Sequence, residues 1–210
     1  NTTNRSSPVQ VGTLTDWKII SADTQESVLA IKNNNSLWSW GYNNSGQLGN
    51  SSITKRSSPV QVGALTDWSK ISINFQSSLA IKTDGTLWSW GLNGYGQLGS
   101  NTTTNRSSPV QVGSLTDWSK INVGRMYVIA IKTDGTLWSW GYNANGQLGL
   151  GNTTNRSSPV QVGALTTWSK VDAGIYWTLA IKTDGTLWSW GMNTNGQLGL
   201  GNTTHYSSPV

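Results

Sequence analysis

The chain repeats itself about every 50 residues, and this period limits its possible folds more than any other feature. Its five prolines all lie in Ser-Ser-Pro-Val segments 50 or 51 residues apart, and Trp-Ser-Trp-Gly recurs four times at intervals of 50. The first unit is one residue longer than the others, between Trp17 and Ala30. We therefore divide residues 1–210, taken as one domain, into repeats of about 1–50, 51–100, 101–150 and 151–200, with 201–210 as the first strand of a further repeat.

The last full repeat predicts four short β-strands, at residues 158–162, 168–173, 176–182 and 187–190. Between the third and fourth strands, Asp184-Gly185 is typical of a tight hairpin turn. Pro159 cannot donate a hydrogen bond inside a sheet, so it is expected at an edge or at a strand start. We expect one antiparallel four-stranded sheet per repeat, with 158–162 as its first strand.

One such sheet cannot bury both of its faces, but sheets stacked around an axis cover one another as the blades of a β-propeller. The 13 tryptophans supply apolar area, while the 24 glycines and the many Ser, Thr and Asn residues disfavour helices. The predicted fold class is therefore all-β, built of β-propeller blades. A linear β-solenoid is the alternative, although its coils are usually much shorter than these repeats.

The net charge of +5 is spread along the chain, because most basic residues recur once per repeat as an Arg before Ser-Ser-Pro and a Lys after Ile. We expect these side chains on solvated strand edges and faces, not in the Lys/Arg cluster of a specific nucleic-acid binder. The absence of cysteine excludes disulfides and thiol chemistry. No apolar run reaches the ~18 residues that a membrane-spanning helix needs.

Residues for catalysis or metal binding are scarce. His205 is the only histidine, so neither a His-based triad nor a His–metal cluster is expected. Most of the nine carboxylates have repeated structural positions, either in the Asp-Gly turns or before a repeat Trp, and Glu26 is the only glutamate. The Gly-rich loops open no helix, so they indicate turns and not phosphate cradles. The sequence therefore predicts a protein that is not an enzyme, with no cofactor and no metal site.

The motif Gly-x-Asn-x-x-Gly-Gln-Leu-Gly appears at residues 41–49, 91–99, 141–149 and 191–199, after runs such as Leu-Ala-Ile-Lys-Thr-Asp-Gly-Thr-Leu-Trp-Ser-Trp-Gly. These motifs resemble the RCC1 repeat, the propeller unit of the regulator of chromosome condensation. The resemblance implies four-stranded blades in a ring of about seven. Bacterial members of the family often carry tandem near-identical copies like these. We expect an extracellular or cell-surface location. Because only four repeats are present, we expect this chain to be cut from a longer array, or to complete a blade with a neighbouring chain through its terminal strand segments.

The resemblance also bears on activity. The founding member of the family is a nucleotide-exchange factor for a small GTPase and binds chromatin, and family repeats typically have His shortly before the Leu-Ala pair. Here that position holds Ser27, Ser77, Tyr127 and Trp177. We therefore do not assign exchange activity to this chain.

Two short windows differ strongly between the repeats, and they are the candidate ligand-binding residues. Window one lies before the Leu-Ala or Ile-Ala pair and consists of Thr24, Gln25, Glu26 and Ser27; Phe75, Gln76 and Ser77; Arg125, Met126 and Tyr127; and Ile175, Tyr176 and Trp177. Window two is the variable part of the Gly-x-Asn-x-x-Gly loop and consists of Tyr42, Asn44 and Ser45; Leu92, Gly94 and Tyr95; Tyr142, Ala144 and Asn145; and Met192, Thr194 and Asn195. The Asn/Thr connectors near residues 50–55 and 100–105 vary more mildly.

The windows exchange charged, aromatic and aliphatic residues, and large aromatics with Arg are what binding patches concentrate. The resemblance implies that window one lies on the propeller face that contacts protein partners. We therefore predict a recognition module that binds a protein through both windows. Drift or packing adjustment on exposed loops is one alternative, although the Thr-Asp-Gly-Thr turns should be exposed too and hardly vary. A carbohydrate-binding module with exposed Trp or Tyr faces, and a structural unit of a surface or filamentous assembly, are the others.

Overall fold

The computed structural model describes residues 6–210, which contain fifteen β-strands in four antiparallel sheets and no helix. The first sheet consists of β1 (Trp17–Ala22), β2 (Ser27–Lys32), β3 (Leu37–Gly41) and β4 (Arg56–Gln61). The second consists of β5 (Trp68–Asn74), β6 (Ser77–Lys82), β7 (Leu87–Gly91) and β8 (Arg106–Gln111). The third consists of β9 (Trp118–Val123), β10 (Tyr127–Lys132), β11 (Leu137–Gly141) and β12 (Arg156–Gln161). The fourth consists of β13 (Trp168–Ala173), β14 (Trp177–Lys182) and β15 (Leu187–Gly191).

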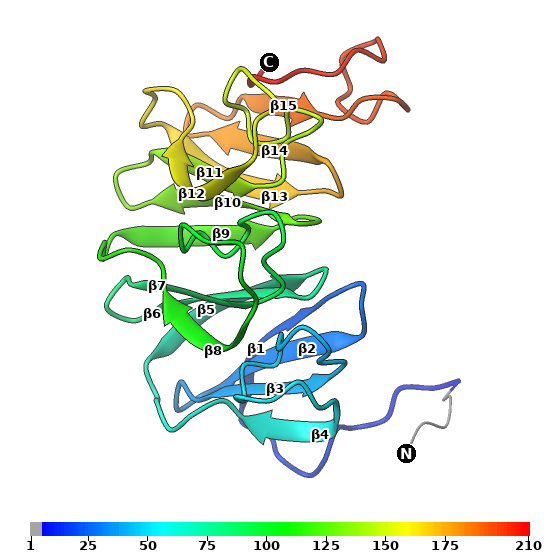
Figure 1. Cartoon of the computed structure of the whole chain (residues 1–210), viewed down its shortest axis with the longest axis vertical. Helices are drawn as coiled ribbons and strands as arrows, with labels where there is room; N and C mark the ends of the chain where they lie inside the picture. The colour runs from blue at the N-terminus through cyan, green and yellow to red at the C-terminus, as the bar shows by residue number, and fades with distance from the viewer. Residues whose placement is uncertain (1–5) are drawn as a thin grey trace.

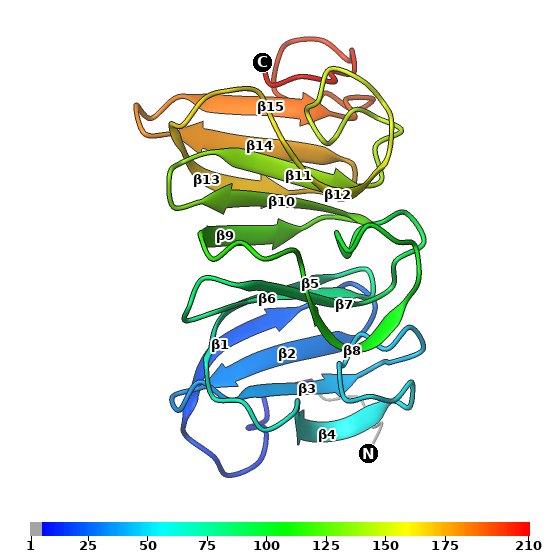
Figure 2. The same ribbon diagram turned by 60° about the vertical axis from the view of Figure 1, so that its left-hand side comes forward.

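The sheets follow one another along the longest axis of the molecule in chain order, with the two ends of the described chain at opposite ends of the stack (Figures 1 and 2). They form a run of four propeller-like blades, and residues 6–210 do not close into a ring. The first strands, β1, β5, β9 and β13, contact one another from blade to blade, while β4, β8 and β12 lie at the opposite edges of their sheets. A scan of this part of the chain for a helix able to cross a membrane finds none.

The strand that contains Ser-Ser-Pro-Val closes the sheet of the preceding repeat, so the prediction that it opens its own sheet is wrong. In the first blade, Ser39 on β3 pairs with Val60 on β4, which belongs to the second repeat. At the other end, Ser189 and Val210 exchange two backbone hydrogen bonds, so the last residues extend the fourth sheet within this chain. The proline prediction is confirmed, because Pro59 lies in an edge strand.

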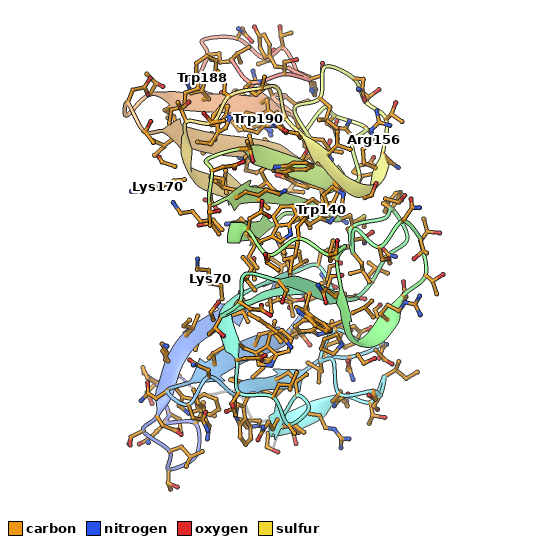
Figure 3. All side chains as sticks on the ribbon, turned by 90° about the vertical axis from the view of Figure 1, so that its left-hand side faces the viewer. Lys70, Trp140, Arg156, Lys170, Trp188 and Trp190 are labelled. Carbon is orange, nitrogen blue, oxygen red and sulfur yellow. The ribbon has the colours of Figure 1, made fainter. Side chains whose placement is uncertain are left out.

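Tryptophan joins neighbouring blades in the same way three times. Trp90, Trp140 and Trp190 have no exposed surface, and each indole Nε1 donates to the carbonyl of Gln47, Gln97 or Gln147 in the preceding blade, at 2.8–2.9 Å. Gly49, Gly99 and Gly149, which end the first three Gly-Gln-Leu-Gly segments, lie against these indoles. At Gly99, a Cβ atom would stand 2.9 Å from Nε1 of Trp140, closer than packing allows. Figure 3 shows Trp140 and Trp190 inside the stack, whereas Lys70 and Lys170 project from one side.

The lysine of each Ile-Lys pair is not solvated in the first three blades, so that prediction is wrong. Lys32, Lys82 and Lys132 are only 5–8% exposed. Each Nζ lies over two Trp rings of its own blade, 4.2–5.1 Å from their centroids, and pairs with an Asp carboxylate at 3.2–3.5 Å. In the fourth blade Thr167 replaces this Asp, and Lys182 is half-buried over Trp168 and Trp188.

Strand direction divides the loops between two faces of the stack. In each antiparallel sheet, the loop from the first to the second strand and the loop from the third to the fourth strand lie at the same end of the strands. These loops contain windows one and two. We call this the variable face. The hairpins between the second and third strands lie at the opposite end of the strands, together with the connections that follow Val62, Val112 and Val162. We call this the turn face.

Candidate recognition surface

Window one forms the tight turn between the first two strands of each blade. Asn74 pairs with Ser77, so Phe75-Gln76 is a two-residue hairpin loop, and both residues have positive φ (43° and 66°), as a type I′ turn requires. The amide N–H of Asp23 donates to the carbonyl of Ser27, which makes the first loop one residue longer and places the extra residue of the first repeat here. Positive φ is uncommon outside glycine, so these backbones are held by the strands on either side.

The last position of window one, which is the third residue of the window and the fourth in the longer first repeat, faces inward in the first three blades, so the prediction that it meets a ligand is wrong there. Ser27, Ser77 and Tyr127 have no exposed surface. The Ser77 hydroxyl donates to the carbonyl of Leu92, and the Tyr127 hydroxyl donates to the carbonyl of Trp177 in the next blade. Burial raises the pKa of the Tyr127 hydroxyl far above its ordinary value. Trp177 at the same position is half-buried.

Glycine before the turn makes room for the aromatic residue after it. A Cβ atom on Gly124 would stand 2.0 Å from the Tyr127 ring, and one on Gly174 would stand 2.2 Å from the Trp177 ring. The second blade has Asn74 before the turn and the small Ser77 after it. Variation at the last position is therefore coupled packing. The sequence contains a signal for this coupling, because Gly precedes the turn where Tyr or Trp follows it and Asn precedes the turn where Ser follows it. The residue before the turn lies outside window one, so a comparison of the windows does not include it.

The backbone brings the two windows of each blade together. The carbonyls of Glu26, Gln76, Met126 and Tyr176 in window one accept hydrogen bonds from the amides of Tyr42, Leu92, Tyr142 and Met192 in window two, at 2.8–3.0 Å. Neighbouring blades also meet, because the Ser45 hydroxyl donates to the Gln76 side-chain oxygen at 2.6 Å. The windows therefore form one surface across the stack.

Five window residues from three blades form a continuous group, which we call the aromatic row: Phe75, Arg125, Tyr176, Tyr142 and Tyr95. The Arg125 guanidinium carbon lies 4.4 Å from the centroid of Phe75 and 5.6 Å from that of Tyr176. Tyr176 is 5.7 Å from Tyr142, which is 4.8 Å from Tyr95. Tyr95 is 40% exposed and the other four are half-buried, so the row lies at the surface.

The rest of the windows is mostly polar. In the first blade the Asn44 amide donates to the Tyr42 hydroxyl, and the Thr24 hydroxyl donates to Asn74. A groove lined by Glu26, Tyr42 and Asn44 includes Ile53 and Lys55 of the connector, which were outside our candidate set. The exposed positions are Thr24, Glu26, Asn44, Gly94, Ala144, Ile175, Thr194 and Asn195, and the half-buried ones are Gln25, Tyr42, Ser45, Gln76, Leu92, Met126, Asn145 and Met192.

Within the windows, only Glu26 and Arg125 are charged. Asp23 accepts hydrogen bonds from the amides of Gln25, Ser27 and Gln76, so its carboxylate shapes two turns. In the part of the chain that the structure describes, no three His, Asp or Glu side chains gather as a metal site would require. The arrangement offers stacking surfaces and hydrogen-bond donors and acceptors to a partner, with no converging acid and base.

The solved structures that share this fold include the three described next. Human WBSCR16 aligns with a TM-score of 0.82 and 24% identity over 92% of this chain and 52% of its own. Prp20p from Saccharomyces cerevisiae aligns with a TM-score of 0.87 and 21% identity over 98% and 53%. Yeast RCC1 (Prp20) in complex with Kap60 gives 0.85 and 21% over 98% and 51%. The chain thus spans about half the length of these structures, and at such identities the likeness shows the fold alone.

Of two comparisons made with the sequence, one identifies a family. A search of curated proteins found no match for the chain. The family model described as RCC1-like domain matches residues 1–210, the whole chain. Together with four propeller-like blades and the repeated Gly-Gln-Leu-Gly joints, this match identifies the repeat. The chain belongs to the RCC1-like domain family.

Proposed function

We propose that this chain is a non-catalytic recognition module that binds a protein partner through its variable face. The observation that carries the proposal is the aromatic row, in which window residues from three blades make one surface patch. Tyr and Arg are enriched among residues that dominate binding energy, and Tyr buries a large area with little loss of conformational freedom.

The stack beneath the row supports this role. Trp90, Trp140 and Trp190 join the blades by identical buried contacts, so the row stands on a pre-organised scaffold. Prp20p, which shares the fold, binds Gsp1p and histones, and yeast RCC1 (Prp20) binds Kap60. A protein is therefore the partner class that we propose for this chain.

The Thr-Asp-Gly-Thr turns have the same sequence in three blades, but this does not support the proposal. Their side chains have structural partners, so their lack of variation follows from packing and does not make the windows exceptional. The proposal also excludes Ser27, Ser77 and Tyr127, which are buried. It depends on the row and on the exposed positions beside it.

The test is a selection of random peptides by display on the folded chain, followed by amide hydrogen exchange of the chain with a recovered peptide. We expect protection in the loops that contain Phe75, Arg125, Tyr142 and Tyr176. A variant with Phe75, Tyr142 and Tyr176 changed to Ala should lose the peptide. A control with Leu65, Leu115 and Leu165 changed to Ala removes three more exposed apolar side chains, 46–48% exposed, from the turn face and should keep the peptide.

Protection confined to the turn face or to the two end sheets would overturn the proposal. So would peptides that bind the row variant as tightly as the unchanged chain. A parallel glycan array addresses the carbohydrate alternative. In residues 6–210 every Trp is buried or half-buried, and of the Phe and Tyr residues only Tyr95 is exposed, so that mode has little fully exposed aromatic surface to use.

A further inference from the structure

Arg125 occupies an unusual position within the aromatic row. It extends from the β9–β10 turn, and its guanidinium carbon lies 4.4 Å from the Phe75 centroid in the preceding blade and 5.6 Å from the Tyr176 centroid in the following blade. Stacking engages the faces of the planar guanidinium group, which leaves its N–H donors at the edge of the plane. Rings from two blades therefore hold the orientation of this cation.

No anion balances this cation within the described chain. The ion pairs among residues 6–210 are the three Lys–Asp pairs of the blade framework, and none includes Arg125. Its Nε atom is buried and has no acceptor in this part of the chain. The carboxylates near window one serve other groups, since Asp23 accepts from backbone amides and Asp172 accepts from the Asn122 side chain.

The lysines show how this fold treats a cation that belongs to the framework. Lys82 lies over Trp68 and Trp88, as Arg125 lies over Phe75 and Tyr176, but Lys82 also has the Asp67 carboxylate 3.2 Å from its Nζ atom. Arg125 has the aromatic neighbours without the carboxylate. Because a guanidinium edge matches the two oxygens of a carboxylate, the missing group is one that a partner can supply.

We propose that the protein partner places an Asp or Glu carboxylate against the edge of Arg125, with an apolar side chain beside it on Tyr142 and Tyr95. This inference rests on the proposed recognition function and names the chemistry of its central contact. The binding segment of the partner is an acidic residue next to an aromatic or aliphatic one. Of the window residues, only Arg125 and Glu26 are charged, so Arg125 is the one cation that the windows themselves offer to an acidic ligand.

The experiment uses peptides from random 12-residue libraries displayed against the unchanged chain, R125Q and R106Q. Arg106 is the matched control, because it is exposed, starts strand β8 beside the variable face and forms none of the ion pairs in residues 6–210. We expect Asp or Glu next to an apolar residue to be enriched on the unchanged chain and on R106Q. On R125Q that enrichment should disappear.

A double-mutant cycle then measures the contact itself. In one recovered peptide the acidic residue is changed to its amide, and dissociation constants are measured by fluorescence anisotropy. The change should weaken binding to the unchanged chain about tenfold or more, and should have little effect on R125Q. R125K, which keeps the charge and loses the planar edge, should bind less tightly than the unchanged chain.

Equal weakening on the unchanged chain and on R125Q would overturn the inference, as would recovered peptides without acidic enrichment. Both results leave the proposed function standing if the exchange footprint still lies on the variable face. If no peptide depends on the aromatic row, the proposed function fails and this inference fails with it.

Discussion

On the turn face, the hairpins of the last three blades contain the same four residues, Thr-Asp-Gly-Thr, whereas on the variable face no two blades have the same window-one sequence. The identical turns have fixed partners: Asp134 accepts from the Thr136 amide and hydroxyl, and that hydroxyl accepts from the Trp138 indole. A Cβ atom on Gly135 would stand 2.1 Å from the carbonyl of Thr166. A position therefore has the same residue in several blades where its side chain contacts the framework, whether or not the residue is buried.

On the variable face, residues without contacts to the framework differ between blades. Phe75, Gln76, Arg125 and Tyr176 of window one contact other window residues, and the residues at these positions differ between blades. The last residue contacts the framework, and where it is large a glycine precedes the turn. The boundary between the scaffold and the proposed recognition surface thus runs through window one, just before its last position.

The largest expected effect is on the framework. Trp140→Ala removes a fully buried indole and its hydrogen bond to Gln97, so we expect a loss of about 3–5 kcal/mol in the free energy of unfolding. Urea denaturation followed by circular dichroism measures it. Tyr142→Ala on the variable face is the control and should cost much less, because that ring is half-buried. Equal losses would remove the distinction between the two regions.

The coupling within window one gives the second effect. Gly124→Asn should be destabilising alone, because its Cβ overlaps the Tyr127 ring, and Tyr127→Ser alone should leave a cavity. The double variant copies the second blade at these positions, and we expect a favourable coupling of about 1–3 kcal/mol in the free energy of unfolding. Strictly additive losses would contradict the coupled-packing account.

Acid should weaken the turn face selectively. Hydrogen bonds from the Thr136 hydroxyl and amide lower the pKa of the Asp134 carboxyl below its ordinary value of 3.8, and the Thr86 and Thr186 groups act likewise on Asp84 and Asp184. A lowered folded-state pKa means that this stabilisation is complete above the unfolded pKa and is lost as the pH falls through the folded one. Unfolding free energies measured from pH 6 to pH 2 should therefore decrease below about pH 4.

The first blade supplies the matched variant for this test. There Asn34 accepts the same hydrogen bonds, from the amide and hydroxyl of Ser36, at 3.1 and 2.7 Å. Changing Asp84, Asp134 and Asp184 to Asn should keep the turns folded at neutral pH and flatten the acid dependence. An unchanged pH profile would show that other carboxylates cause the acid response.

The smallest expected effect concerns the fourth blade. Thr167→Asp should restore the pair that Lys82 makes with Asp67, here with Lys182, and stabilise the fold by about 0.2–1 kcal/mol, because the Asp partners in the other blades are 39–43% exposed. The gain should shrink in 1 M NaCl, measured by thermal unfolding. A salt-independent gain would argue against an ion pair.

Part of this arrangement could be predicted from the sequence. Alternating residues and Asp-Gly turns predict the strands around Leu179 and Leu187, and the five residues of the aromatic row were all among the candidates. The grouping of strands was not predictable, because a period does not say where a sheet begins, and Val60 pairs across the repeat boundary. The burial of Lys82 depends on the placement of Trp68 and Trp88 on either side of it, which a sequence position cannot show.

The central claim is that the aromatic row binds and the tryptophan framework stabilises. The most direct measurement takes one variant, with Phe75, Tyr142 and Tyr176 changed to Ser, and determines both its free energy of unfolding and its affinity for a peptide selected on the unchanged chain. We predict that the variant loses less stability than Trp140→Ala alone, while peptide affinity falls about 30-fold or more. Undiminished affinity, or a loss of stability as large as that of Trp140→Ala, would contradict the account.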